Sequence, residues 1–154
     1  MLLDGASATG TSAFASALAE RHGHPLVRSS RIADHRNLHD CYRNLLTRPG
    51  PLILDGSFVS DFVPDPLLTG SSRLIWSQAL DLAGTVARGH GVLIHVVTTA
   101  PACPDPHPDQ CIPCTRAAIT DAYRRAFDTL SAHTAVLTAD MAHGPVQPLP
   151  RRSG

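Results

Sequence analysis

The chain has 154 residues, of which 43% are apolar and 5% aromatic, and its 13 basic and 13 acidic residues leave no formal net charge. This length predicts one domain with an aliphatic, alanine-rich core. The balanced charge argues against a dedicated binder of nucleic acids or membrane surfaces. No stretch reaches the roughly 18–20 apolar residues of a membrane helix. Residues 1–19 lack a basic segment, so we expect a cytoplasmic protein without a secretory signal.

Apolar runs alternate with helical patterns along the chain. Strands are expected at residues 1–4, 25–28, 51–55, 91–98 and 134–138, and helices at 12–22, 34–47, 75–88 and 115–132. The strand segments are continuous apolar runs, which are typical of a sheet covered on both faces, and their alternation with helices predicts parallel pairing. We therefore expect an α/β domain over residues 1–140, with a five-stranded, mainly parallel sheet between two helical layers. A flexible, proline-rich tail is expected at residues 141–154.

The first expected strand leads into a glycine-rich loop and then a helix. Residues 4–12 read Asp-Gly-Ala-Ser-Ala-Thr-Gly-Thr-Ser, close to the phosphate-binding pattern G-x-x-x-x-G-K-[ST] with threonine in place of the lysine. Such a loop aims backbone N–H groups and a helix N-terminus at an anion. The competing interpretation is an ordinary strand-to-helix turn. The candidate nucleotide-binding residues are Gly5, Ala8, Thr9, Gly10, Thr11 and Ser12, and the Ser12 hydroxyl is the expected ligand of Mg²⁺.

Lysine is absent from the chain, so all 13 basic residues are arginine. Arginine is a planar fork and does not simply replace the compact charge of a lysine in such a loop. Ligands of parallel sheets bind at the carboxyl ends of the strands, where Asp4, Gly5, Arg28 and Asp55 fall. The candidates to supply positive charge to phosphates are Arg28, Arg31, Arg73 and Arg116.

Three segments taken together resemble a known family. They are Leu-Leu-Asp-Gly…Gly-Thr-Ser at the start, Leu-Ile-Leu-Asp-Gly-Ser-Phe-Val-Ser-Asp at 52–61, and Ser-Ser-Arg-Leu-Ile-Trp-Ser-Gln-Ala-Leu at 71–80. Over residues 1–140 this order is similar to the thymidylate-kinase branch of P-loop nucleoside monophosphate kinases, especially the short bacterial and phage versions. The resemblance implies a P-loop NTPase fold with a small lid at about residues 99–117.

The resemblance also implies roles for individual residues. Asp55 and Ser57 match the third-strand signature, in which Gly56 stands at the position of an arginine. Arg73 falls on the arginine that binds the monophosphate, and Gln78 keeps its context. Arg116, in the expected lid, is added as a source of positive charge, so the candidate catalytic residues are Asp55, Arg73 and Arg116. Arg28, at a strand end, is added in the same way to the candidate substrate-binding residues, which are Arg28, Ser57, Arg73 and Gln78.

The implied activity is phosphoryl transfer from a Mg²⁺-bound nucleoside triphosphate, such as ATP, to a pyrimidine (deoxy)nucleotide or a modified relative. Small nucleotides are then the expected partners, membranes and nucleic acids are not, and a homodimer remains open. Thr11 and Gly56 stand where the family places basic residues on phosphates, which weakens transfer. Two alternatives stay open for that reason. One is a degenerate protein that binds nucleotides without transfer, and the other is a P-loop domain used for another nucleotide reaction.

Three of the four cysteines lie in one short segment with a histidine. Cys103, His107, Cys111 and Cys114 form the pattern C-x₃-H-x₃-C-x₂-C, and three thiolates with one imidazole are a typical structural Zn²⁺ set. We expect this zinc to order the lid. The competing interpretation is a proline-rich loop with free thiols or one disulfide. Among other singular residues, Trp76 is expected in the core in preference to a base-stacking role, and His95 is expected to be a buried histidine with its polar needs satisfied.

Overall fold

The structure is a computed structural model that describes residues 1–5, 10–32, 37–63, 72–98 and 113–143. One sheet contains the five strands β1 (Leu2–Asp4), β2 (Leu26–Arg28), β3 (Ile53–Asp55), β4 (Val92–Val97) and β5 (Ala135–Asp140). Their order is β2-β3-β1-β4-β5, and every neighbouring pair is parallel. The expected five-stranded sheet is therefore confirmed, and it is parallel throughout.

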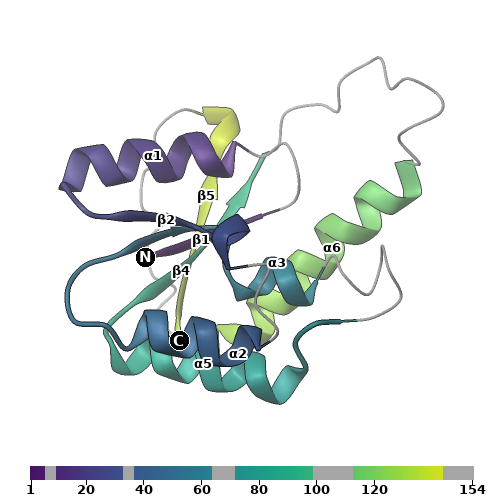
Figure 1. Cartoon of the computed structure of the whole chain (residues 1–154). Helices are drawn as coiled ribbons and strands as arrows, with labels where there is room; N and C mark the ends of the chain where they lie inside the picture. The colour runs from purple at the N-terminus through teal and green to yellow at the C-terminus, as the bar shows by residue number, and fades with distance from the viewer. Residues whose placement is uncertain (6–9, 33–36, 64–71, 99–112, 144–154) are drawn as a thin grey trace.

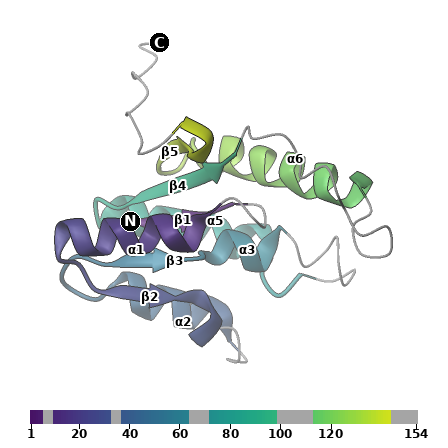
Figure 2. The same cartoon turned by 90° about the horizontal axis from the view of Figure 1, so that it is seen from above.

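Helices cover both faces of this sheet, as Figures 1 and 2 show. Helix α1 (Thr11–His22) lies on one face. The other face carries α2 (Leu38–Leu46), α3 (Phe58–Phe62), α5 (Trp76–Arg88) and α6 (Pro113–Leu130). Two short 3₁₀ turns, Ser29–Arg31 and Met141–His143, follow β2 and β5. The expected α/β fold with three layers is thus confirmed, whereas the expected lid lies mostly outside the described residues.

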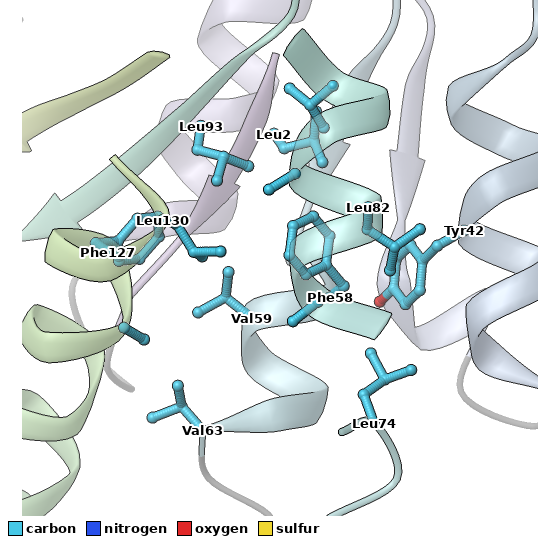
Figure 3. Close-up of a cluster of buried hydrophobic side chains, with 14 of the residues drawn as sticks. Leu2, Tyr42, Phe58, Val59, Val63, Leu74, Leu82, Leu93, Phe127 and Leu130 are labelled. Atoms are coloured by element: carbon cyan, nitrogen blue, oxygen red, sulfur yellow. The ribbon is translucent and has the colours of Figure 1, made fainter. Parts of the chain in front are cut away.

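The continuous apolar runs of the strands fill two separate cores. Successive strand residues point to opposite faces, so Leu2 enters the larger core while Leu3 enters the smaller one. The larger core lies between the sheet and the four helices on its face, around Phe58, Leu82 and Leu130 (Figure 3). The smaller core packs Leu3, Ile53, Ile94 and Val96 against α1. Both faces of the central strands are therefore buried, which explains why their sequences do not alternate.

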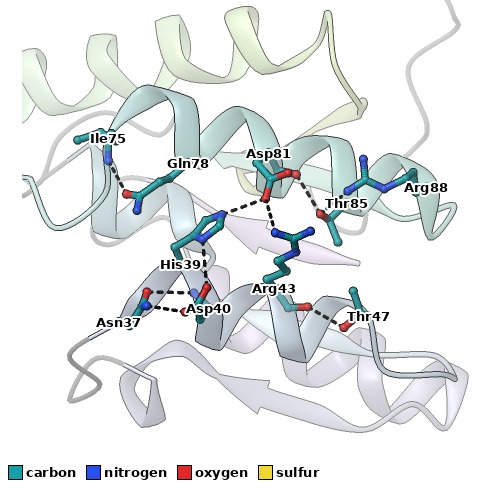
Figure 4. Close-up of polar contacts among 10 residues, drawn as sticks. All are labelled: Asn37, His39, Asp40, Arg43, Thr47, Ile75, Gln78, Asp81, Thr85 and Arg88. Atoms are coloured by element: carbon teal, nitrogen blue, oxygen red, sulfur yellow. Dashed lines mark hydrogen bonds and ion pairs between the residues drawn. The ribbon is translucent and has the colours of Figure 1, made fainter.

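Polar contacts fix α2 beside α5 on the larger core (Figure 4). His39 Nε2 lies 2.9 Å from Asp81 Oδ2, and Arg43 Nη1 lies 3.8 Å from the same oxygen. The Asn37 side chain caps α2 by accepting a hydrogen bond from the Asp40 N–H at 3.2 Å. These contacts fix the orientation of α2 and α5. The apolar side chains of both helices therefore pack toward the sheet.

The core expectation for Trp76 is wrong, because its side chain is 41% exposed. Trp76 is the first residue of α5, and its ring meets the ring of Phe62 edge-on, with centroids 4.5 Å apart. Leu82 and Val86, farther along the same helix, are the residues that enter the core. His95, by contrast, is buried as expected, with its ring stacked on Phe127 at 4.4 Å. None of the described helices combines the length and the apolar character that a membrane-spanning helix needs.

Candidate nucleotide-binding cleft

Three neighbouring strands bring their last residues to one cleft at the carboxyl edge of the sheet. Asp4 ends β1, Arg28 ends β2 and Asp55 ends β3, and Asp55 pairs in register with both Arg28 and Leu3. The cleft has a volume of about 490 Å³. Its described lining consists of these three residues together with Gly5, Thr11, Ser12, Ser29, Ser30, Gly56, Ser60 and Tyr123. The last residues of the three strands therefore lie together at one edge of the sheet, as the sequence predicts.

Asp55 lies at the centre of the cleft and joins two of its walls. Ser12 Oγ, from the first turn of α1, donates a hydrogen bond to Asp55 Oδ1 at 3.1 Å. On the other side, Arg28 Nε lies 3.7 Å from Asp55 Oδ2. Arg28 is 62% exposed while Asp55 is 8% exposed. The carboxylate is thus fixed, and the guanidinium keeps most of its surface exposed.

The start of α1 shows why the sequence needs a glycine before Thr11. Gly10 caps the helix with φ of 80°, a left-handed conformation that glycine adopts without steric cost. The first N–H groups of a helix have no partner within the helix and attract anions. Residues 6–9, including Ala8 and Thr9, lie outside the described residues, so the proposed binding of phosphate by the loop amides stays a prediction.

Asp4 is the most heavily hydrogen-bonded group of the cleft, and the sequence reasoning did not anticipate this role. Its Oδ2 accepts bonds from the N–H groups of Ser57 and Ser60 at 2.9 and 2.8 Å, and it lies at the same two distances from their hydroxyls. Its Oδ1 accepts from the Gly5 N–H at 2.9 Å and faces the Tyr123 hydroxyl at 3.4 Å. This carboxylate therefore connects β1, α3 and α6.

Burial changes the acid–base properties of this cluster. Removal from water raises the pKa of Asp4 to about 6, although the hydrogen bonds from Ser57, Ser60 and Gly5 oppose the rise. Burial and the nearby Asp4 carboxylate also raise the pKa of Tyr123. The Tyr123 hydroxyl consequently stays protonated and is the donor of its contact with Asp4 Oδ1. The pKa of His95, in the strand next to Asp4, is lowered by its burial.

Gly56 explains locally why the arginine of the resembling family is absent. Its φ is 76°, and a Cβ atom at this position would lie 2.3 Å from Ser29 Oγ. Any side chain would therefore meet both backbone strain and a steric clash with the turn after β2. Gly56 lets the chain leave β3 sharply, so that Ser57 caps α3 by accepting a bond from the Val59 N–H at 3.1 Å.

The other expected site residues lie in different places. Ser57 is completely buried beneath the cleft, and Gln78 uses its Oε1 to accept a hydrogen bond from the Ile75 N–H at 3.1 Å. Arg73 does not belong to the described lining of the cleft, and its charge acts on the Tyr42 hydroxyl. That hydroxyl donates to Asp61 Oδ2 at 2.6 Å. The structure thus brings Ser12, Arg28 and Asp55 together, but it does not add Ser57, Gln78 or Arg73 to the described lining.

Several expected residues cannot be placed around the cleft. Cys103, His107 and Cys111 lie outside the described residues, as do the side chains of Arg31, Cys114 and Arg116. Within the described ranges, no group of three His, Cys, Asp or Glu residues is arranged to hold a metal ion. The zinc interpretation therefore stays a prediction from the sequence.

Besides Ser29 and Ser30 in the turn after β2, the sequence reasoning missed the lining residues Ser60 and Tyr123. Both belong to helices, and no short motif marks them. The one available signal for Ser60 was its spacing of three residues from Ser57, which places both on one side of a helix. Tyr123 offered a weaker signal, because a lone tyrosine in a predicted helix is most simply a core residue.

Comparison with known proteins gives the fold. No family model and no curated protein sequence matches the chain. Among solved structures, the YorR protein from Bacillus subtilis in complex with phosphorylated GDP matches with a TM-score of 0.67 and 13% identity, over 92% of this chain and 83% of that one. The deoxyadenosine kinase from M. mycoides with bound dCTP matches with a TM-score of 0.51 and 9% identity, over 91% and 90%. The chain therefore shares the overall α/β fold of these two proteins.

Proposed function

We propose that this protein binds a Mg²⁺-bound nucleoside triphosphate in the cleft and transfers its terminal phosphoryl group to a pyrimidine (deoxy)nucleotide or a modified relative. The observation that carries the proposal is the Ser12–Asp55 hydrogen bond at 3.1 Å, beside the glycine cap of α1. A P-loop hydroxyl and a strand-end carboxylate are the pair that holds Mg²⁺ in P-loop enzymes. The two structural neighbours, captured with phosphorylated GDP and with dCTP, add support at the level of the fold.

Mg²⁺ prefers hard oxygen ligands, and the Ser12 hydroxyl and Asp55 carboxylate fit this preference. Bound there, the ion would neutralise charge on the phosphates. In this proposal Arg28 contacts phosphate oxygens, which is supported by the large exposure of its guanidinium at the cleft. The N-terminus of α1 favours negative charge at the same place. Phosphoryl transfer depends mainly on such positioning and charge stabilisation.

Nucleotide binding without transfer is the second candidate function. It is favoured by Thr11, which lines the cleft where the P-loop pattern has lysine, and by the absence of lysine from the whole chain. Calorimetry with ATP and Mg²⁺, together with phosphorus NMR of mixtures containing ATP and thymidylate, cytidylate or uridylate, separates the two candidates. Transfer to any of these acceptors supports the kinase proposal. Binding of ATP without any transfer supports the second candidate.

Replacing Thr11 with lysine is expected to raise the transfer rate about 10–100-fold, because it places a compact positive charge over the phosphates. Initial rates with saturating ATP and the preferred acceptor measure the effect. Thr11→Arg is the matched control, since its planar guanidinium fits this position less well and should give a smaller gain. A rate unchanged by Thr11→Lys would show that the missing lysine does not limit the reaction.

We also propose that Cys103, His107, Cys111 and Cys114 bind one structural Zn²⁺, on the basis of their spacing and ligand chemistry. Protein purified without a histidine tag is expected to contain about one zinc per chain by elemental analysis. Cys111→Ser should lose the metal, whereas Cys41→Ser, which alters the cysteine outside the pattern, should keep it. Zinc-free wild-type protein, or equal zinc in both variants, would contradict the assignment.

A further inference from the structure

A second pocket opens at the opposite edge of the sheet from the cleft. It has a volume of about 200 Å³ and lies at the amino ends of three parallel strands, where Leu2, Leu52 and Gly91 enter β1, β3 and β4. Apolar side chains of α2 and α5, among them Leu46 and Val86, complete its walls. The proposed nucleotide reaction makes no use of this pocket, because the two sites lie at opposite ends of the strands.

The ionisable side chains that line this pocket are all basic. His24 follows α1, Arg48 follows α2 and His90 follows α5, so three separate connections each contribute one basic side chain. No acidic side chain belongs to the described lining. Behind the wall, Arg88 Nη2 donates a hydrogen bond to Thr85 Oγ1 at 2.9 Å, and Thr85 itself lines the pocket (Figure 4). The chain as a whole has equal numbers of arginine and acidic residues. A pocket whose described lining has basic side chains but no acidic ones therefore favours an anionic ligand.

The backbone at His90 provides an independent observation. Its φ is 53°, and among the described residues it is the one that is not glycine and has a positive φ. His90 follows the C-cap Gly89 of α5, with the His90 N–H bonded to Ala87 O at 3.0 Å and the Gly91 N–H bonded to Val86 O at 2.8 Å. Helices that end in this way usually carry glycine at the left-handed position. The chain has glycine on both sides of it, yet it places an imidazole there, at the pocket.

We propose that this pocket binds a small oxyanion, a phosphate or a carboxylate, carried on an apolar body. Arg48 supplies a permanent positive charge and a bidentate donor. The two imidazoles supply further N–H donors, and the leucine and valine side chains of the walls receive the apolar body. The volume is smaller than the roughly 300–1,000 Å³ of sites that enclose drug-sized molecules, so a complete nucleotide does not fit.

Amide NMR of the full chain, titrated with phenyl phosphate, tests the proposal. The Gly50 and Gly91 signals report on this pocket, and the Gly5 and Gly10 signals report on the cleft. We expect phenyl phosphate to shift Gly50 and Gly91 at lower concentrations than inorganic phosphate or benzyl alcohol, because only phenyl phosphate offers both charge and an apolar body. Shifts confined to Gly5 and Gly10, or equal responses to all three probes, would overturn the proposal.

Two variants separate binding from folding. Arg48→Gln removes the permanent charge and should weaken the binding of phenyl phosphate at least fivefold. His90→Gly should also weaken binding, at least threefold, yet raise the melting temperature by about 2 °C, because glycine removes the backbone strain. His90→Asn is the control, since asparagine tolerates the left-handed conformation but lacks the imidazole. Unchanged affinity in Arg48→Gln and His90→Gly would contradict the site, whatever their stability.

Discussion

Replacing Asp4 with alanine is expected to lower the free energy of unfolding by about 4 kcal/mol at pH 5. The variant leaves the buried N–H and hydroxyl of Ser57 without their acceptor, and each orphaned buried donor costs about 1–3 kcal/mol. The partly buried Ser60 N–H loses one acceptor but keeps Ser57 O at 3.1 Å. The variant also frees the Tyr123 hydroxyl from its contact on α6. Urea denaturation followed by circular dichroism measures the loss. A change below about 1 kcal/mol would show that the cleft reorganises without the carboxylate.

The cost of this substitution should depend on pH in a direction that burial dictates. The pKa of Asp4 is raised to about 6 in the folded protein, against about 3.9 for an unfolded aspartate. Between these values the folded state binds the extra proton, so the stability contributed by Asp4 is present at low pH and falls as pH rises through 6. From pH 5 to pH 7.5 this removes on the order of 1 kcal/mol. The cost of Asp4→Ala should shrink by the same amount.

Two further variants isolate the carboxylate from its surroundings. Ser60→Ala removes one hydroxyl but keeps the buried acid, so it should lower stability by about 1 kcal/mol and retain the pH dependence. Asp4→Asn keeps the shape and cannot titrate, so the dependence between pH 5 and 7.5 that belongs to Asp4 should disappear from it. A pH profile of Asp4→Asn that matches the wild type would assign the dependence to other groups.

The fold could be predicted from the sequence because its signals are local and repeated. Five apolar runs separated by helical patterns give a covered parallel sheet, and each strand of the structure overlaps an expected one. Helix α3 was missed because it has only five residues, too few for a helical period to show. It follows Gly56, which has a left-handed φ of 76° and no room for a Cβ beside Ser29, and no pattern in the segment itself reveals either constraint.

The candidate site was predicted in part, for a related reason. Ser12 and Asp55 belong to recognisable strand and loop motifs, so their meeting across 43 positions of sequence follows from parallel pairing once the motifs are placed. The partners of Asp4 come from α3 and α6, across separations of 53 to 119 positions. No motif encodes those contacts, since they arise from helix packing. Gln78 shows that a motif match can also mislead. The resemblance assigns Gln78 to substrate binding, but its side chain accepts a hydrogen bond from the Ile75 N–H and caps the start of α5.

Replacing Asp55 with asparagine is expected to reduce phosphoryl transfer by about 10²–10³, the usual cost of losing one preorganised group that stabilises charge. The amide oxygen can still accept the Ser12 hydrogen bond, but the variant loses the negative charge that favours Mg²⁺ and faces Arg28. The melting temperature should change by less than about 3 °C, because the lost ion pair is with a largely exposed arginine and such pairs contribute little to stability. Initial rates at saturating ATP and Mg²⁺ measure the effect.

Asp128→Asn is the matched control, because it removes a carboxylate that is 70% exposed on α6 and does not belong to the described lining of the cleft. Its transfer rate should equal that of the wild type. The affinity for ATP in the two variants then locates the role of Asp55. If Asp55 acts through Mg²⁺, adding the ion should tighten ATP binding in the wild type and in Asp128→Asn, but much less in Asp55→Asn. Equal rates and equal Mg²⁺ responses in both variants would remove Asp55 from the reaction and, with it, the observation on which the kinase proposal rests.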